Sequence, residues 1–361
     1  MAYRKTFRTY KEQLEFMKER GIVIEDEKEA LETLSTFSYY SLVNLNKHLY
    51  GGLHAREFKG HPTILDLQLA HMLNMDFYHT VLKGILYVES SFKTKLAYLI
   101  SRKFGPVSRE DIDDPRDNFL YRGHYDPENN MAPGILRTLR NKFNYLHSPA
   151  NINSYSHQFL SGGRTLPPWM FIHDIEFGLA ISWYSILIED DKKEICTKMI
   201  SGETGSSQAP CSSSLSAEFL TAALDLLREY RNTIAHGERV FPSEMTGALP
   251  KEALFTLLPP GILSPAEYDQ GIGKSDPFAC LLSLVLFIHD PVLMLSYLTE
   301  IQTQLEFAGR IRDIMAPGAL DSYKILGIPD FTLDRLLAVS HQRFGRLSRA
   351  YFNPGSHPGS S

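Results

Sequence analysis

Apolar residues recur every three or four positions along most of the chain, a spacing that places them on one face of an α-helix. The longest run of this kind extends from Ile64 to Ile100, and another extends from Leu215 to His236. The two-residue alternation typical of strands is scarce. The pattern therefore predicts an all-α fold. Further helices are expected over residues 10–20, 27–37, 38–50, 134–145 and 166–187.

Turn-forming and low-complexity stretches divide these predicted helices into parts. We expect an N-terminal helical segment over residues 1–60, a main helical domain over residues 61–350 and a disordered tail over residues 351–361. Residues 201–214 are rich in serine and glycine, which is typical of a linker-like loop. Residues 242–275 contain several prolines and are expected to form an irregular insertion.

The most apolar segment, residues 278–298, has almost the length of a membrane-spanning helix. It is broken in its middle by His289, Asp290 and Pro291, and the run before that break is too short to cross a bilayer. We therefore predict a buried pair of helices and no membrane association. The basic N-terminus has no apolar run of the kind found in secretory signals, so a cytoplasmic protein is expected.

The three cysteines, Cys196, Cys211 and Cys280, are far apart and show no CxxC or CxxH spacing. This usage suits a reducing compartment and gives no zinc signature. We therefore expect no metal site and no cofactor.

Two polar groups interrupt the predicted apolar faces. Asp76 and Glu89 fall on or beside the apolar stripe of the helix over residues 64–100. Each is expected to meet an arginine, a histidine or a backbone donor, because an unpaired buried carboxylate is costly. His173, Asp174 and Glu176 are the polar exceptions within residues 166–187. They could face the end of the helix over residues 215–236. Gly178, in the same segment, indicates a close helix–helix approach.

Charge restricts where nucleic acid could bind. The net charge of −5 and the pI near 6.2 exclude an overall basic field, so any such site must be a local patch. One candidate patch is the predicted helix with Arg137, Arg140 and Lys142, which could bind phosphates or form an ordinary solvated face. A second candidate is a basic edge on the last predicted helix, with arginines at a spacing of three residues: Arg343, Arg346 and Arg349.

The strongest candidate chemistry lies at the end of the helix over residues 215–236, in the sequence RNTIAH. Arg231 can bind phosphate bidentately, and His236 can exchange a proton near neutral pH. On an ideal helix, side chains five residues apart differ by about 140° in direction and about 7.5 Å in height. Gly237 suggests that the helix ends there and that its last turn can distort. Both side chains could then point into one cleft, most economically at a two-fold interface between two copies. The alternative is a structural histidine stabilised by the helix dipole.

The wider sequence resembles the Abi-like abortive-infection family of bacteria, whose members contain HEPN domains. RNTIAHGERVF, residues 231–241, resembles the RN-x-x-AH-x-x-R motif, and PPWMFIHDIEFG, residues 167–178, resembles the PxW…FG segment. Residues 9–24, 37–50 and 75–101 match the first half of the family in order and spacing. The resemblance covers most of the first 240 residues.

This resemblance implies an HEPN-like multi-helix bundle with an N-terminal helical extension and loop insertions. It also implies that Arg231 and His236 match the catalytic pair. Asn232 matches the polar residue beside the arginine, and Arg239 matches a basic position after the pair that would contact RNA. The chain departs from the pattern at Pro242, where relatives often have asparagine.

The expected function is abortive-infection defence against phage by a metal-independent endoribonuclease. RNA would be the substrate, or a bound regulatory RNA, and a homodimer would form through the motif. Two alternatives stay open: a protein that holds a specific RNA without constitutive cleavage, and a toxin controlled by a partner such as an antitoxin.

Overall fold

The chain was analysed as a computed structural model, which describes residues 7–52, 56–107, 118–152, 154–202, 214–236, 245–315 and 320–352. Within these ranges every regular element is a helix, and strand-type pairing is confined to two isolated bridges, Val23–Thr63 and Val107–Leu166. The prediction of an all-α fold is confirmed. No helix in this part of the chain is both long and apolar enough to cross a membrane.

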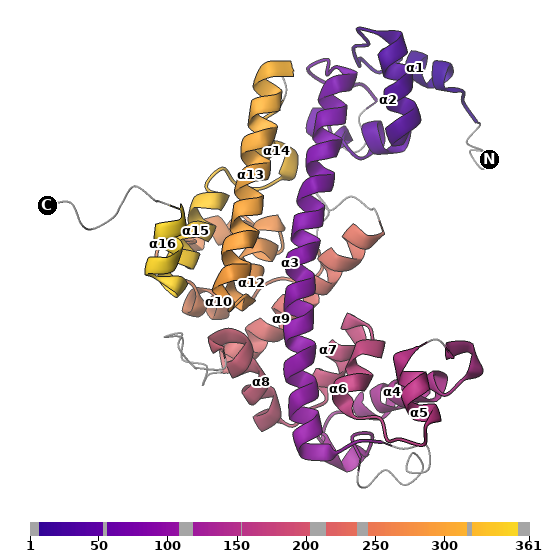
Figure 1. Ribbon diagram of the computed structural model, residues 1–361. Helices are drawn as coiled ribbons and strands as arrows, with labels where there is room; N and C mark the ends of the chain where they lie inside the picture. Colours follow the sequence, from indigo (N-terminus) through magenta and orange to yellow (C-terminus); the bar gives the residue numbers. More distant parts are fainter. Residues whose placement is uncertain are drawn as a thin grey trace, which may run out of the picture.

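Helix α3, Ile64–Phe104, runs the length of the molecule, and the other helices pack around it (Figure 1). It begins with a capping box in which the Thr63 hydroxyl accepts the Asp66 N–H at 3.1 Å and Asp66 accepts the Thr63 N–H at 2.7 Å. Glu89 is buried and has a partner at 2.6 Å, but this partner is Lys93 in place of the expected arginine, histidine or backbone donor. Asp76 is exposed, so the expectation of a buried carboxylate that needs a partner is wrong for this residue.

The N-terminal helices form a lobe at one end of α3 (Figure 1). Helices α1, Tyr10–Glu19, and α2, Glu27–Tyr39, enclose a hydrophobic cluster of their own together with the first residues of α3. The helix expected over residues 38–50 is replaced by a π-helical turn, η1 Tyr40–Asn44, and a 3-10 turn, η2 Lys47–Tyr50. The change follows a kink at Ser38, whose φ is 61°.

A second lobe lies at the other end of α3 and contains α4 to α7 (Figure 1). The single helix expected over residues 166–187 is wrong, because the chain turns extended at Ile175 and Glu176. The carbonyl oxygen of Ile175 accepts a hydrogen bond from Lys93 Nζ of α3 at 2.8 Å, a tertiary contact that takes the place of a helical one. The elements of this lobe are η5 Arg122–His124, α4 Ala132–Leu146, η6 Pro149–Asn151, α5 Tyr155–Ser161, α6 Pro168–Phe171, η7 Ile172–Asp174 and α7 Phe177–Ser185.

The middle of the chain supplies α8, Glu189–Ser201, and α9, Ser214–Ala235, which contact each other and α3. The expected irregularity of residues 242–275 is wrong for the part that is described. It contains α10, Lys251–Leu257, and α11, Pro265–Asp269, and its residues Leu249, Leu254 and Tyr268 are buried in the main core. Residues 203–213, most of the expected linker, lie outside the described residues.

The C-terminal helices confirm the buried helix pair. Helix α12, Pro277–Phe287, is almost entirely buried, and α13, Pro291–Met315, follows the His289–Pro291 break. The remaining elements are α14 Ser322–Leu326, α15 Thr332–Phe344 and α16 Arg346–Phe352.

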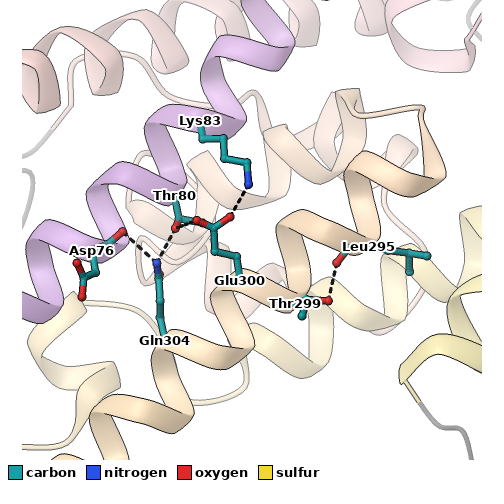
Figure 2. A network of polar contacts seen from close by, with 7 residues as sticks. All are labelled: Asp76, Thr80, Lys83, Leu295, Thr299, Glu300 and Gln304. Atoms are coloured by element: carbon teal, nitrogen blue, oxygen red, sulfur yellow. Dashed lines mark hydrogen bonds and ion pairs between the residues drawn. The ribbon is translucent and has the colours of Figure 1, made fainter.

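Polar contacts fasten α13 along α3 (Figure 2). Glu300 accepts hydrogen bonds from Thr80 at 3.0 Å and from Lys83 at 2.5 Å, and Gln304 donates to Thr80 at 2.7 Å. One turn further along α3, Gly84 allows the ring of Tyr297 to approach, since a Cβ at Gly84 would lie 2.9 Å from Tyr297 Cε2. The C-terminal helices are thus held on the helix that also carries both lobes.

Candidate functional site at the end of α9

The end of α9 is fixed to the core by its apolar face. Leu226, Leu227 and Tyr230 are fully buried, and the hydroxyl of Tyr230 donates to the Ser275 carbonyl at 3.1 Å. Burial raises the pKa of Tyr230 well above its usual value, so the hydroxyl remains a donor. This anchor holds the turn that begins at Arg231 in a defined position.

Arg231 is half-buried beside the neighbouring asparagine. Its Nη1 donates to Asn232 Oδ1 at 3.3 Å, and no acidic side chain in the described part of the chain pairs with it. A guanidinium without a carboxylate partner keeps its donors for an oxyanion such as phosphate. Asn232 thus lies where the sequence places it, next to the arginine and in contact with it.

His236 is exposed at the last turn and does not meet Arg231. Its backbone N–H donates to the Asn232 carbonyl at 3.0 Å, so the helical hydrogen-bond pattern continues through His236. The expected distortion before Gly237 is therefore not seen up to His236, and the pair keeps the angular separation of about 140° of an ideal helix. Gly237, Arg239 and Pro242 lie outside the described residues.

Glu229 is a site residue that the sequence analysis missed. Its carboxylate accepts the N–H groups of Thr246 at 2.8 Å and Gly247 at 3.3 Å, and also the Thr246 hydroxyl. Burial alone would raise the pKa of Glu229, but these hydrogen bonds outweigh it, and the pKa is lowered. The chain that returns after His236 is thereby tied to α9 two residues before Arg231.

A pocket of about 330 Å³ lies against the same turn, because Ile234 forms part of its wall. The remaining wall comes from η1, η2, the two residues between them and α3, and it contains three histidines and two asparagines. The lining residues are Ser41, Leu45, Asn46, His48, His71, Asn74, Met75, Tyr78, His79 and Ile234. Across the described ranges, no three His, Cys, Asp or Glu side chains are grouped so that they could hold a metal ion.

The basic residues of α4 do not form one free face. Arg137 is exposed, Arg140 is half-buried with its Nε enclosed, and Lys142 forms an ion pair with Glu176 at 2.9 Å. Phosphate binding by these three residues stays a prediction, with Arg137 the most accessible of them.

The expected basic edge near the C-terminus is wrong at Arg343. This side chain turns inward, where it donates to the Val285 carbonyl and, at 2.8 Å, to His289 Nδ1. Burial lowers the pKa of Arg343 to about 10. The side chains of Arg346 and Arg349 lie outside the described residues.

The polar residues around η7 and the start of α7 bond to the second lobe and not to the end of α9. Asp174 accepts the hydroxyl of Ser156 on α5, Glu176 pairs with Lys142 on α4, and His173 is exposed. Gly178 does mark the predicted close approach: a Cβ there would lie 3.2 Å from Arg228 Cδ, where α7 meets α9.

The structure shows an all-α protein with an arginine and a histidine on one helix end, beside a small pocket whose lining is mostly apolar. The family model described as Abi-like protein matches residues 32–242, more than half of the chain and all of α9. The chain therefore belongs to the Abi-like family, and this membership supports a role in abortive infection. Neither the curated proteins nor the solved structures give a match.

Proposed function

We propose that the protein is an abortive-infection endoribonuclease whose active site combines Arg231 of one copy with His236 of a second copy. The observation that carries the proposal is the environment of these two side chains. Arg231 has no acidic partner in the described chain, and His236 is exposed at the end of the same helix, inside the family match.

The reaction follows from what these groups can supply. The 2′-hydroxyl of a ribose attacks the adjacent phosphorus, a 2′-O–P bond forms and the P–O5′ bond breaks. One proton leaves the 2′-oxygen and one is delivered to the 5′-oxygen, which gives a 2′,3′-cyclic phosphate and a 5′-hydroxyl. His236 serves as general acid or base. Arg231 stabilises the negative charge that builds on the phosphoryl oxygens.

The separation of the pair within one chain supports a site that is shared between two copies. Since α9 stays helical to His236, the side chains of Arg231 and His236 leave the helix on different faces. A two-fold contact between two α9 ends brings the arginine of each copy to the histidine of the other. The hydrogen bonds of Tyr230 and Glu229 fix the backbone at the end of α9, and this positions the arginine and the histidine of each copy.

The test is cleavage of a labelled RNA by purified protein in excess EDTA, compared for wild type, His236→Ala and His173→Ala. We expect cleavage by wild type and by His173→Ala, because His173 is an exposed histidine away from the site. We expect none by His236→Ala, and we expect cyclic-phosphate ends on the products. Cleavage that stops when EDTA is added contradicts the proposal.

A second candidate is an RNA-holding protein without constitutive cleavage, which the separation of Arg231 and His236 within one copy favours. Fewer positively charged side chains are available to bind RNA than the sequence predicts, because Lys142 pairs with Glu176 and Arg343 turns into the core. RNA that co-purifies with intact ends from both wild type and His236→Ala would favour this function over cleavage.

A further inference from the structure

The pocket beside Ile234 differs from an ordinary packing gap because one buried side chain in its wall has a polar atom without a hydrogen-bond partner. Asn74 on α3 borders the pocket and is only 8% exposed, yet its Oδ1 has no hydrogen-bond partner in the described chain. By contrast Asn46, also in the wall, donates to the Leu42 carbonyl at 2.9 Å. A buried amide oxygen left unpaired is costly, so a partner from a ligand is the economical explanation.

The surroundings of Asn74 are suited to a flat, neutral ring. His71 lies in the wall with its ring edge-on to Phe37, 5.5 Å between centroids, and His79 is exposed at the rim. Burial lowers the pKa of His71, which keeps its imidazole uncharged at neutral pH. At about 330 Å³, the pocket is at the small end of the range for ligand sites, near the size of one nucleoside.

We propose that this pocket binds an unstacked nucleobase of the RNA, with adenine preferred, and that Asn74 reads the edge of the base. An asparagine carboxamide offers one acceptor and one donor, which match the amino group and N7 of adenine. Aromatic and histidine side chains stack on bases that RNA presents outside a helix. The inference rests on the proposed function, because it takes RNA as the ligand.

The position of the pocket on α9 connects base recognition to the phosphate chemistry. Arg231 precedes Ile234 by three residues, so the two side chains differ by only about 60° on the helix. His236 follows Ile234 by two residues and points about 160° away. One copy therefore offers the pocket and Arg231 to the same nucleotide, while the histidine comes from the other copy.

The experiment measures affinity and not cleavage. Short uridine oligonucleotides with 2′-O-methyl sugars cannot undergo attack by the 2′-oxygen, and one version contains a single adenine. We expect wild type and His236→Ala to bind the adenine version about tenfold more tightly than the all-uridine version. Asn74→Ala is expected to lose this preference, and Asn141→Ala, which changes an exposed asparagine on α4, is expected to keep it. If Asn74→Ala does not fold, His79→Ala at the rim is expected to weaken binding of the adenine version severalfold.

The outcomes separate this inference from the proposed function. Equal affinity of wild type for the two oligonucleotides overturns the base pocket, whether or not RNA is cleaved. An adenine preference that survives in Asn74→Ala overturns the role of Asn74. An adenine preference in a wild-type protein that never cleaves RNA supports the pocket and contradicts the nuclease.

Discussion

Arg231 and His236 leave the end of α9 in directions that differ by about 140°, because the His236 N–H still bonds to the Asn232 carbonyl at 3.0 Å. A single copy thus presents a phosphate-binding group and a proton-transfer group on separate faces. This relationship makes the second copy part of the proposed active site.

Arg231→Ala should lower kcat/KM for RNA cleavage by about 10²–10³-fold, because it removes a charge that acts on the transition state. Its effect on thermal stability should be small, since the one hydrogen bond that is lost joins Arg231 to its neighbour Asn232. Arg310→Ala on α13 is the matched control: Arg310 is a largely exposed arginine, and cleavage should not change. A similar loss of activity in both variants would mean that cleavage depends on the overall charge of the protein and not on Arg231 in particular.

Gly84→Ala should destabilise the fold by about 1–3 kcal/mol, because the new Cβ would lie 2.9 Å from Tyr297 Cε2 and 3.0 Å from Leu284 Cδ1. Gly134→Ala in α4 is the control, since nothing lies within 4 Å of a Cβ there. That change should be neutral or stabilising by up to about 1 kcal/mol. Urea denaturation of the two variants measures the difference, and equal stability would mean that α13 can move away from α3.

Glu229→Ala should cost about 1–3 kcal/mol, because two backbone N–H groups lose their acceptor. Thr246→Val, which removes only the hydroxyl, should cost less. The pKa of Glu229 is lowered from 4.5, so its contribution is complete above pH 4.5 and is lost as the pH falls through the lowered value. Denaturation curves of wild type and Glu229→Ala should therefore converge in acid. A stability difference between the two proteins that is the same at all pH values would argue against a role for the ionised Glu229 carboxylate.

Asp276→Asn should make the protein more stable at pH 7.5, by about 1–3 kcal/mol. Burial raises the pKa of Asp276 from 3.8 to about 6, although its carboxylate accepts the N–H groups of Gly273 and Ala279. The stability that comes from protonation is therefore complete below pH 3.8 and is lost as the pH rises through about 6. Asparagine can accept the same hydrogen bonds without a charge.

The matched control for this change is Asp26→Asn, which alters an exposed residue that caps α2 in the same way. It should give no gain at pH 7.5. Thermal melts across the range of pH 4 to 7.5 decide the matter: an advantage of Asp276→Asn that does not shrink on acidification would contradict the raised pKa of Asp276.

The regular spacing of apolar residues is sufficient to predict the longest helices. The sustained apolar spacing of α3 and α9 predicted both within a few residues, and the apolar run broken at Pro291 predicted the buried pair α12 and α13. The prolines in residues 245–275 predict an irregular segment, but Pro250 caps α10 and Pro265 opens α11. Ser264 and Glu267 form a capping box there, a signal that was readable in the sequence.

Contacts between residues far apart in the chain determine the features that local sequence patterns did not predict. The break at Ile175 depends on Lys93, which is 82 positions away in the chain. The inward turn of Arg343 depends on the Val285 carbonyl at the end of α12. The pocket brings together η1, η2, α3 and α9, and no spacing rule connects His48, His71 and Ile234. The helix end with Arg231 and His236 can be proposed from the sequence because both residues lie on one short segment, and its role as a site stays a prediction.

The central claim is that each active site takes its arginine and its histidine from different copies. Arg231→Ala and His236→Ala, each inactive alone, should regain cleavage when they are co-expressed and purified as a mixed dimer. In the mixed dimer one of the two sites is intact, so the purified mixed dimer is expected to have about half of wild-type activity. No cleavage above that of either single variant, in a preparation in which the mixed dimer is shown to form, would contradict the claim.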